Sequence, residues 1–123
     1  MAVVHMTGDK FNQTIEENSI VILDFWAAWC GPCRSYGPIF EAVSNKYPDI
    51  VFAKVDTEKE RELASAFGIQ SIPSTAFFRD KVFLHMQPGL LPAEGLEDLI
   101  RQVSSLDMEK VKSEIAKEQA EDA

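Results

Sequence analysis

The chain has 123 residues, of which 46 % are hydrophobic and 26 % charged, as in ordinary globular domains and unlike disordered segments or disulfide-dense secreted scaffolds. A chain of this length can fold around one core without a disulfide to hold it together. Its 20 acidic and 12 basic residues give a net charge of −8, which repels phosphate backbones and anionic membrane surfaces. We therefore expect one soluble domain that binds neither nucleic acid nor membrane.

The N-terminal quarter predicts a helix followed by a buried strand. After the short apolar start Val3–Met6, either Thr7 or Asp9 can cap a helix with an apolar face. The almost continuous apolar run Ile20–Trp26 predicts a strand that is covered on both faces, as in the centre of an α/β sheet. Asp24 is the one residue that breaks this run.

A helix, a strand and a second helix are predicted next. Apolar residues recur at helical spacing from Cys30 to the residue before Pro48, and Pro38 is placed to kink this helix. The segment Ile50–Asp56 is strand-like, and the sequence after it predicts a helix capped by Thr57. An alternation of strands and helices is typical of an α/β fold.

The C-terminal part predicts a hairpin, a helix and a tail. Two strand-like segments flank Asp80-Lys81 and predict an antiparallel hairpin, although this pair lacks the glycine of most such turns. The helix that Pro92 opens has an apolar face that can pack on the sheet. We expect residues 1–106 to form the domain and residues 107–123 an acidic, helical or frayed extension, with partner docking as the alternative role.

The chain has only two cysteines, Cys30 and Cys33, in the sequence C-G-P-C. A structural zinc site needs four ligands, and only His5 and His85 are left to complete one, without the spacing of a histidine pair. Haem attachment requires a histidine directly after the second cysteine, where this chain has arginine. A disulfide that closes so short a loop stabilises by only roughly 2 kcal/mol. We expect no metal, and zinc binding is kept as a rival hypothesis.

Dithiol chemistry explains more of the surroundings of the two cysteines. Cys30 falls where a buried strand ends and a helix begins, so unpaired N–H groups and the helix dipole favour its thiolate. Cys30 is therefore the expected nucleophile, exposed to partners. Cys33, one turn further along, is expected to be shielded and to act as the resolving thiol. Pro32 fits the first turn of a helix, where its missing N–H is not needed.

The motif "FWAAWCGPC", a following helix with Pro38, and "IPS" ahead of a hairpin and Gly89 together resemble the thioredoxin family. The resemblance runs from about Val3 to Leu106. It implies the thioredoxin fold, an α/β fold whose central mixed sheet has helices on both faces. It also implies reduction of disulfides in partner proteins, with the cysteine pair recycled by an NADPH-dependent flavoprotein thioredoxin reductase and no cofactor held by the chain.

The Gly-Pro pair between the cysteines is typical of thioredoxins rather than of protein disulfide isomerases, glutaredoxins or bacterial disulfide oxidants. Reduction potentials of about −270 mV and about −180 mV for thioredoxin and the isomerase differ by roughly 4 kcal/mol. We therefore expect a reductant. An oxidase or isomerase role outside the cytoplasm, and a non-catalytic interaction subunit, are the alternatives.

The resemblance also implies roles for individual residues. Asp24 matches a buried aspartate whose raised pKa lets it take the proton of Cys33, and Lys54 matches a lysine beside it. Trp26 is expected to pack beside the site. Pro73 matches a cis-proline that faces the disulfide. The implied docking surface for partner proteins is small and mostly apolar, and consists of Trp29, Gly31, Pro32, Ile72, Pro73 and Gly89.

Three positions depart from the family pattern. Ser74 stands where threonine is usual, Asp80-Lys81 replaces an Asn-Gly-like turn, and Pro88 precedes Gly89 where a small branched residue is common. We expect these departures to affect docking and hairpin stability rather than the reaction. The N-terminus has no basic region followed by a long apolar segment, so a cytoplasmic location is expected. We also expect the chain to be a monomer.

Overall fold

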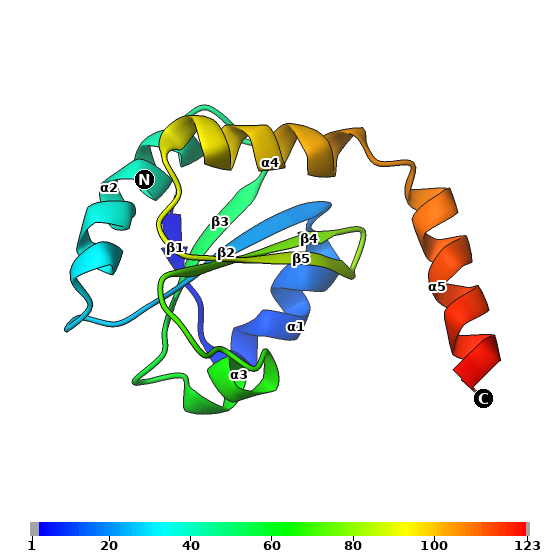
Figure 1. Ribbon diagram of the computed structural model, residues 1–123, viewed down its shortest axis with the longest axis horizontal. Coiled ribbons are helices and arrows are strands. Elements are labelled where there is room, and N and C mark those ends of the chain that lie inside the picture. The colour runs from blue at the N-terminus through cyan, green and yellow to red at the C-terminus, as the bar shows by residue number, and fades with distance from the viewer. Residues whose placement is uncertain (1–2, 123) are drawn as a thin grey trace.

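The computed structural model describes residues 3–122, which form a five-stranded sheet between two layers of helices (Figure 1). Helices α2 and α4 cover one face of this sheet, and α1 and α3 cover the other. The elements are β1 Val3–His5, α1 Gly8–Glu17, β2 Ile20–Trp26, α2 Gly31–Ser44, β3 Val51–Asp56, α3 Arg61–Ala66, β4 Ser74–Arg79, β5 Val82–Pro88, α4 Ala93–Ser105 and α5 Met108–Asp122. The predicted fold is confirmed.

The sheet is mixed, with the strand order β1-β3-β2-β4-β5. Strands β1, β3 and β2 run parallel to one another, whereas β4 is antiparallel to both of its neighbours, β2 and β5. Strand β2 is therefore central, and the cysteine loop follows its carboxyl end. The register places Asp24 of β2 between Lys54 of β3 and Thr75 of β4.

Side chains alternate along the strands and build a separate core on each face of the sheet. Leu23 and Phe25 of β2 point toward α1 and α3, where they pack in an apolar cluster. Ile22 points the other way, into the cluster formed with α2 and α4. Asp24 follows Ile22 by two residues on the same strand, so its side chain also faces α2 and α4.

The β4–β5 hairpin makes its predicted tight turn without glycine. Asp80 and Lys81 both have positive φ angles, 51° and 70°, which side chains other than glycine, asparagine and aspartate adopt uncommonly. The backbone N–H of Asp80 donates to the carbonyl of Ser19 at 2.8 Å, which ties the turn to the start of β2. The turn is thus anchored by a contact that the local sequence does not reveal.

The predicted cap of the third helix is wrong. Thr57 does not begin α3, because its backbone N–H and its hydroxyl both donate to the carbonyl of Trp26, at 2.9 and 3.0 Å. The carboxylate of Asp56 accepts from the backbone N–H groups of Glu58 and Lys59, two and three residues further along the chain. These bonds hold a turn, and α3 begins at Arg61.

The C-terminal segment forms a helix of its own. One guanidinium nitrogen of Arg79, Nη1, donates to the carbonyls of Val103, Ser104 and Leu106 at 3.0, 3.1 and 2.8 Å and so fixes the end of α4. Helix α5 then runs away from α4 along the hairpin end of the molecule (Figure 1). Of its residues, Met108 is buried.

Candidate active site

The two cysteines lie at the junction of β2 and α2, as predicted. Cys30 is the N-cap residue of α2, Cys33 lies in its first turn, and their Cα atoms are 5.2 Å apart in a disulfide. The backbone N–H of Cys33 donates to Cys30 Sγ at 3.2 Å. Gly31 and Pro32 occupy the exposed first positions of the helix, where proline leaves no donor unpaired.

The expectation that Cys30 is exposed is wrong for this disulfide form, whereas Cys33 is shielded as expected. Cys30 is 4 % exposed and Cys33 is 3 % exposed, so accessible surface does not distinguish them. The reason is that Cys30 Sγ lies 3.7 Å from the carbonyl oxygen of Ile72, which covers it. What differs is the polar surroundings, because the N–H of the helix start points at the Cys30 sulfur.

Asp24 is fully buried, with no exposed surface. Neither of its carboxylate oxygens has a hydrogen-bond partner within residues 3–122. Burial raises the pKa of Asp24 from 3.8 to about 7, and the positive charge of Lys54 opposes part of this rise. The carboxyl can therefore take up or release a proton near neutral pH.

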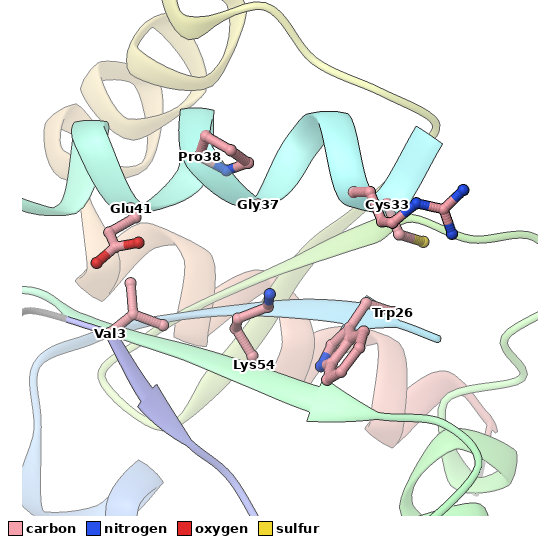
Figure 2. Close-up of a pocket in the computed structure, with 8 residues that line it drawn as sticks. Val3, Trp26, Cys33, Gly37, Pro38, Glu41 and Lys54 are labelled. Atoms are coloured by element: carbon pink, nitrogen blue, oxygen red, sulfur yellow. The ribbon is translucent and has the colours of Figure 1, made fainter. Parts of the chain in front are cut away.

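A cleft of about 290 Å³ between α2 and the sheet is lined by Cys33 and by Lys54, the residue paired with Asp24 in the sheet register. Figure 2 shows Lys54 rising from β3 into this cleft beside Trp26, with Cys33 at one end and Glu41 at the other. The Nζ atom of Lys54 lies 4.6 Å from the centroid of the Trp26 ring, a cation–π distance. Trp26 thus packs beside the site, and Lys54 is held within it.

The loop before β4 faces the cysteines. The Ile72–Pro73 peptide bond is cis, Ile72 is half-buried and Pro73 is buried. Gly89 donates its N–H to the carbonyl of Pro73 at 2.8 Å. Its φ of 90° requires glycine, and no atom beyond its chain neighbours lies within 4 Å of where its side chain would be. The backbone is therefore open to an approaching chain at this point.

Trp29 is the most accessible apolar side chain near the cysteines. It is 68 % exposed, and its indole nitrogen donates to a carboxylate oxygen of Glu58 at 3.1 Å. A groove of about 340 Å³ runs beside it, bounded on one side by Ile72 and on another by Arg61. An exposed aromatic ring held by a hydrogen bond is suited to contact a partner protein.

Two of the departures from the family pattern lie close to this loop. Ser74 is buried and its hydroxyl donates to the carbonyl of Ser71 at 2.7 Å, which braces the loop that contains Pro73. Pro88 is paired in register with Ser74 at the end of the hairpin and is exposed. The hydroxyl group of Ser74 therefore stabilises the loop before β4.

A buried hydroxyl pair on the Asp24 side of the sheet was not predicted from the sequence. The phenol oxygen of Tyr36 on α2 lies 2.8 Å from Thr75 Oγ1 on β4, and both residues are fully buried. The helical pattern includes Tyr36 only as one of its apolar positions. The signal available was that a buried tyrosine requires a hydrogen-bond partner for its hydroxyl group.

Residues 3–122 contain neither a cluster of metal-binding side chains nor a helix that could span a membrane. Within this described part of the chain, no group of three or more histidine, cysteine, aspartate or glutamate side chains could hold a metal ion. No helix in the same range is long and apolar enough to cross a membrane.

Comparison with known proteins connects this geometry to a family. The family model described as Thioredoxin matches residues 2–102. A chain from Streptomyces coelicolor that carries the provisional name thioredoxin 2 is 47 % identical over 120 residues, covering 98 % of this chain and 90 % of its own length. Thioredoxin of Bacillus subtilis is 32 % identical, covering 83 % of this chain and 98 % of its own length.

Among solved structures, a single-residue mutant of the thioredoxin of Halobacterium salinarum superimposes with a TM-score of 0.78 at 30 % identity, covering 85 % of this chain and 92 % of its own. The residues that match the family model, 2–102, include both cysteines, Asp24 and the cis-proline loop. The chain therefore belongs to the thioredoxin family of thiol–disulfide oxidoreductases, whose members reduce disulfides in other proteins through such a cysteine pair.

Proposed function

We propose that Cys30 is the attacking cysteine and Cys33 the resolving one. In the reduced protein the Cys30 thiolate attacks one sulfur of a partner disulfide, so that a mixed disulfide forms and the other partner sulfur leaves as a thiolate. Cys33, deprotonated, then attacks Cys30 Sγ. This second step forms the Cys30–Cys33 disulfide and releases the first partner sulfur as a thiolate, and the partner has gained two electrons.

The observation that carries this assignment is the bond from the Cys33 N–H to Cys30 Sγ at 3.2 Å. A donor at the start of a helix stabilises negative charge on the sulfur it faces, and the dipole of α2 has the same effect. The thiolate of Cys30 is therefore favoured over its thiol. Cys33 instead lines the cleft below α2, which suits it to react within the molecule rather than with a partner.

Asp24 is proposed as the acceptor of the Cys33 proton, directly or through one water molecule. A carboxyl whose pKa is raised to about 7 by burial is close to ideal for proton transfer at neutral pH. The Lys54 side chain in the same cleft tempers that rise. The role of Lys54 is therefore to keep Asp24 partly ionised, and thus able to accept, at neutral pH.

Partner proteins are proposed to bind across Trp29, Ile72 and Gly89. The backbone at Ile72 would pair with an extended partner segment as an added strand does, and the open space at Gly89 lets that segment approach. Gly31, Pro32 and Pro73 complete this docking surface. Such a surface selects accessible disulfides in partly extended chains.

Thioredoxin-family proteins act on disulfide-containing proteins and are reduced by thioredoxin reductase. For this chain we propose the same cycle, in which a flavoprotein reductase passes electrons from NADPH to the Cys30–Cys33 disulfide. A cytoplasmic monomer fits this cycle, because that compartment maintains thiols in the reduced state. Cell fractionation and light scattering of the purified protein test the location and the oligomeric state.

We also propose that residues 1–106 suffice for the reaction and that residues 107–123 are an extension. The matched family model ends at residue 102, and α5 lies apart from the cysteines (Figure 1). A chain that ends at Leu106 should reduce insulin disulfides within about twofold of the full rate. A large loss of activity in a folded truncated chain would assign α5 a part in the reaction.

Trapping tests the two cysteine roles. With Cys33→Ser, mixed disulfides with partner proteins should accumulate, because the bond to Cys30 forms and is not resolved. With Cys30→Ser, no such adducts should accumulate. Accumulation with Cys30→Ser alone would reverse the assignment. A double cysteine-to-serine variant that retains its cellular activity would favour the non-catalytic alternative, and stoichiometric zinc in the reduced protein would favour the metal site.

A further inference from the structure

Four residues from four elements form a polar group under α2. Lys54, Asp24 and Thr75 are aligned across β3, β2 and β4 by the register of the sheet. Their neighbours two positions back or ahead, such as Ile22 of β2 and Phe77 of β4, belong to the core on the α2 and α4 face, so these three side chains share that face. Tyr36 of α2, the helix that covers this face, contacts Thr75 through its hydroxyl group.

The two hydroxyl groups of Tyr36 and Thr75 carry two protons, but the hydrogen bond between them takes up only one. Each hydroxyl carries one proton, and only one of the two can lie between oxygens that are 2.8 Å apart. Whichever hydroxyl donates within the pair, the proton of the other is free to point elsewhere. A buried O–H without an acceptor is destabilising, so an acceptor is expected nearby.

A buried side-chain acceptor that lacks a donor lies on the neighbouring strand, in register with Thr75: the carboxylate of Asp24. Its two oxygens are buried and have no hydrogen-bond partner among residues 3–122. Residues directly opposite on antiparallel strands have Cβ atoms only about 4.5–5.5 Å apart, and Asp24 and Thr75 are such a pair. A rotation of one side chain, or one water molecule, can join the spare hydroxyl proton to the carboxylate.

We propose that the Tyr36–Thr75 hydroxyl pair donates a hydrogen bond to the ionised carboxylate of Asp24, and that both residues are positioning residues for its proton transfer. The consequence for catalysis rests on the proposed role of Asp24 as acceptor of the Cys33 proton. The hydroxyls neither gain nor lose protons in the cycle. They donate to the carboxylate while it is charged and so make that form less unfavourable.

The titration of the groups around Asp24 is consistent with this arrangement. Burial raises the pKa of Tyr36 far above its usual value, the bond to Thr75 opposes this, and the charge of Asp24 raises it further, so the phenol stays a donor. On the other sides, Lys54 of β3 favours the charged carboxylate. The remaining titratable or charged groups that line the cleft are Cys33, Arg34 and Glu41, all on α2.

The test measures the pKa of Asp24 in the reduced, full-length protein. Carbon-13 NMR of the labelled Asp24 carboxyl, recorded as a function of pH, gives this pKa. Hydrogen bonds to a charged form lower its pKa, so the double variant Tyr36→Phe/Thr75→Val, which removes both hydroxyls, should raise the pKa of Asp24 by about one unit, a tenfold change in proton affinity. Each single variant leaves one hydroxyl free to donate and should raise that pKa by less. Thr75→Ser retains the hydroxyl and should keep the original value. If the double variant fails to fold, the two single variants still test the sign of the change.

Tyr47→Phe is the matched control. Its phenol donates to a carboxylate oxygen of Glu97 at 3.2 Å, beyond the C-terminal end of α2, so the variant loses a comparable bond away from Asp24. It should leave the pKa of Asp24 unchanged. The inference is overturned if the folded double variant Tyr36→Phe/Thr75→Val leaves that pKa within about 0.2 units of the original, or if any of the three hydroxyl variants lowers it, against the expected rise of about one unit.

The failure of this inference and the failure of the proposed function can be told apart. The rate at which Cys33 resolves a preformed mixed disulfide, measured against pH, reports on the role of Asp24. If Asp24→Asn leaves this profile unchanged, the acceptor role is wrong whatever the hydroxyl variants do. If Asp24→Asn slows resolution while the hydroxyl variants leave the pKa of Asp24 unmoved, the hydroxyl pair alone loses its role.

Discussion

The two faces of the central sheet are built from the same strands but carry different chemistry. Toward α1 and α3, β2 contributes Leu23 and Phe25 to a cluster of apolar side chains. Toward α2 and α4, the same strand contributes Ile22 and then Asp24, the one fully buried acidic residue among residues 3–122. One strand thus supplies stability on one face and, at the end nearest the cysteines, a titratable group on the other.

The difference shows how the fold tolerates a buried carboxyl. A charged group without partners is costly in an apolar interior, and the usual outcome is a shift of its pKa toward the neutral form. Asp24 follows this pattern, because burial raises its pKa to about 7. The apolar face supplies stability that offsets this cost. Three substitutions test this contrast, beginning with the variant expected to have the largest effect.

Phe25→Ala removes a large side chain from the apolar face. Phe25 is fully buried and its ring packs on Phe67 with centroids 5.6 Å apart. Truncating a buried phenylalanine costs about 3–5 kcal/mol in the free energy of unfolding. Urea denaturation at several pH values should show this loss as nearly constant with pH. A loss that varies strongly between pH 4 and pH 8 would mean that the two faces are not independent.

Asp24→Asn, at the residue next to Phe25, should change the pH dependence of the free energy of unfolding. The folded pKa of Asp24, about 7, lies above its ordinary value of 3.8, so the stabilising contribution of this carboxyl is complete below pH 3.8 and is lost as pH rises through 7. A difference of roughly three pKa units between the folded and the unfolded protein corresponds to about 4 kcal/mol in the free energy of unfolding. The unfolding free energy of the variant, relative to the original protein, should therefore rise by about that amount between pH 4 and pH 8. A constant difference would show that Asp24 titrates normally.

Lys54→Met should have a smaller effect, confined to the polar face. The ammonium group lowers the pKa of Asp24, so its removal should raise that pKa, by roughly one unit. The methionine side chain can keep the contact with Trp26. Carbon-13 NMR of the labelled carboxyl measures the shift. A pKa of Asp24 that stays the same or falls would remove Lys54 from the electrostatics of the site.

The sequence predicted the parts of the fold that depend on local pattern. The apolar run Ile20–Trp26 is strand β2 with the same bounds, and the turn at Asp80-Lys81 forms where the two strand patterns meet. The predicted cap at Thr57 failed, because the carbonyl of Trp26, distant in sequence, accepts both of the bonds that Thr57 donates. Local pattern cannot reveal a partner of that kind.

Some residues of the candidate site were predicted from the sequence and others were not. The cysteines, Asp24 and Pro73 stand out by residue type or by resemblance, and the fold gathers them at one end of β2. The Tyr36–Thr75 pair was missed because each residue suits its own element, and only the packing of α2 on β4 brings the two hydroxyls within 2.8 Å. Relative exposure of the sulfurs also could not be foreseen, since the loop at Ile72 covers Cys30 in this form.

The reduction potential of the Cys30–Cys33 couple decides in which direction electrons flow between this protein and its partners. Equilibration of the purified protein with glutathione or dithiothreitol buffers, followed by alkylation of the free thiols, gives this potential. A reductant of the thioredoxin type should have a potential of about −270 mV. A potential of about −180 mV, that of protein disulfide isomerase, would contradict a reducing role and assign the chain to disulfide formation or rearrangement.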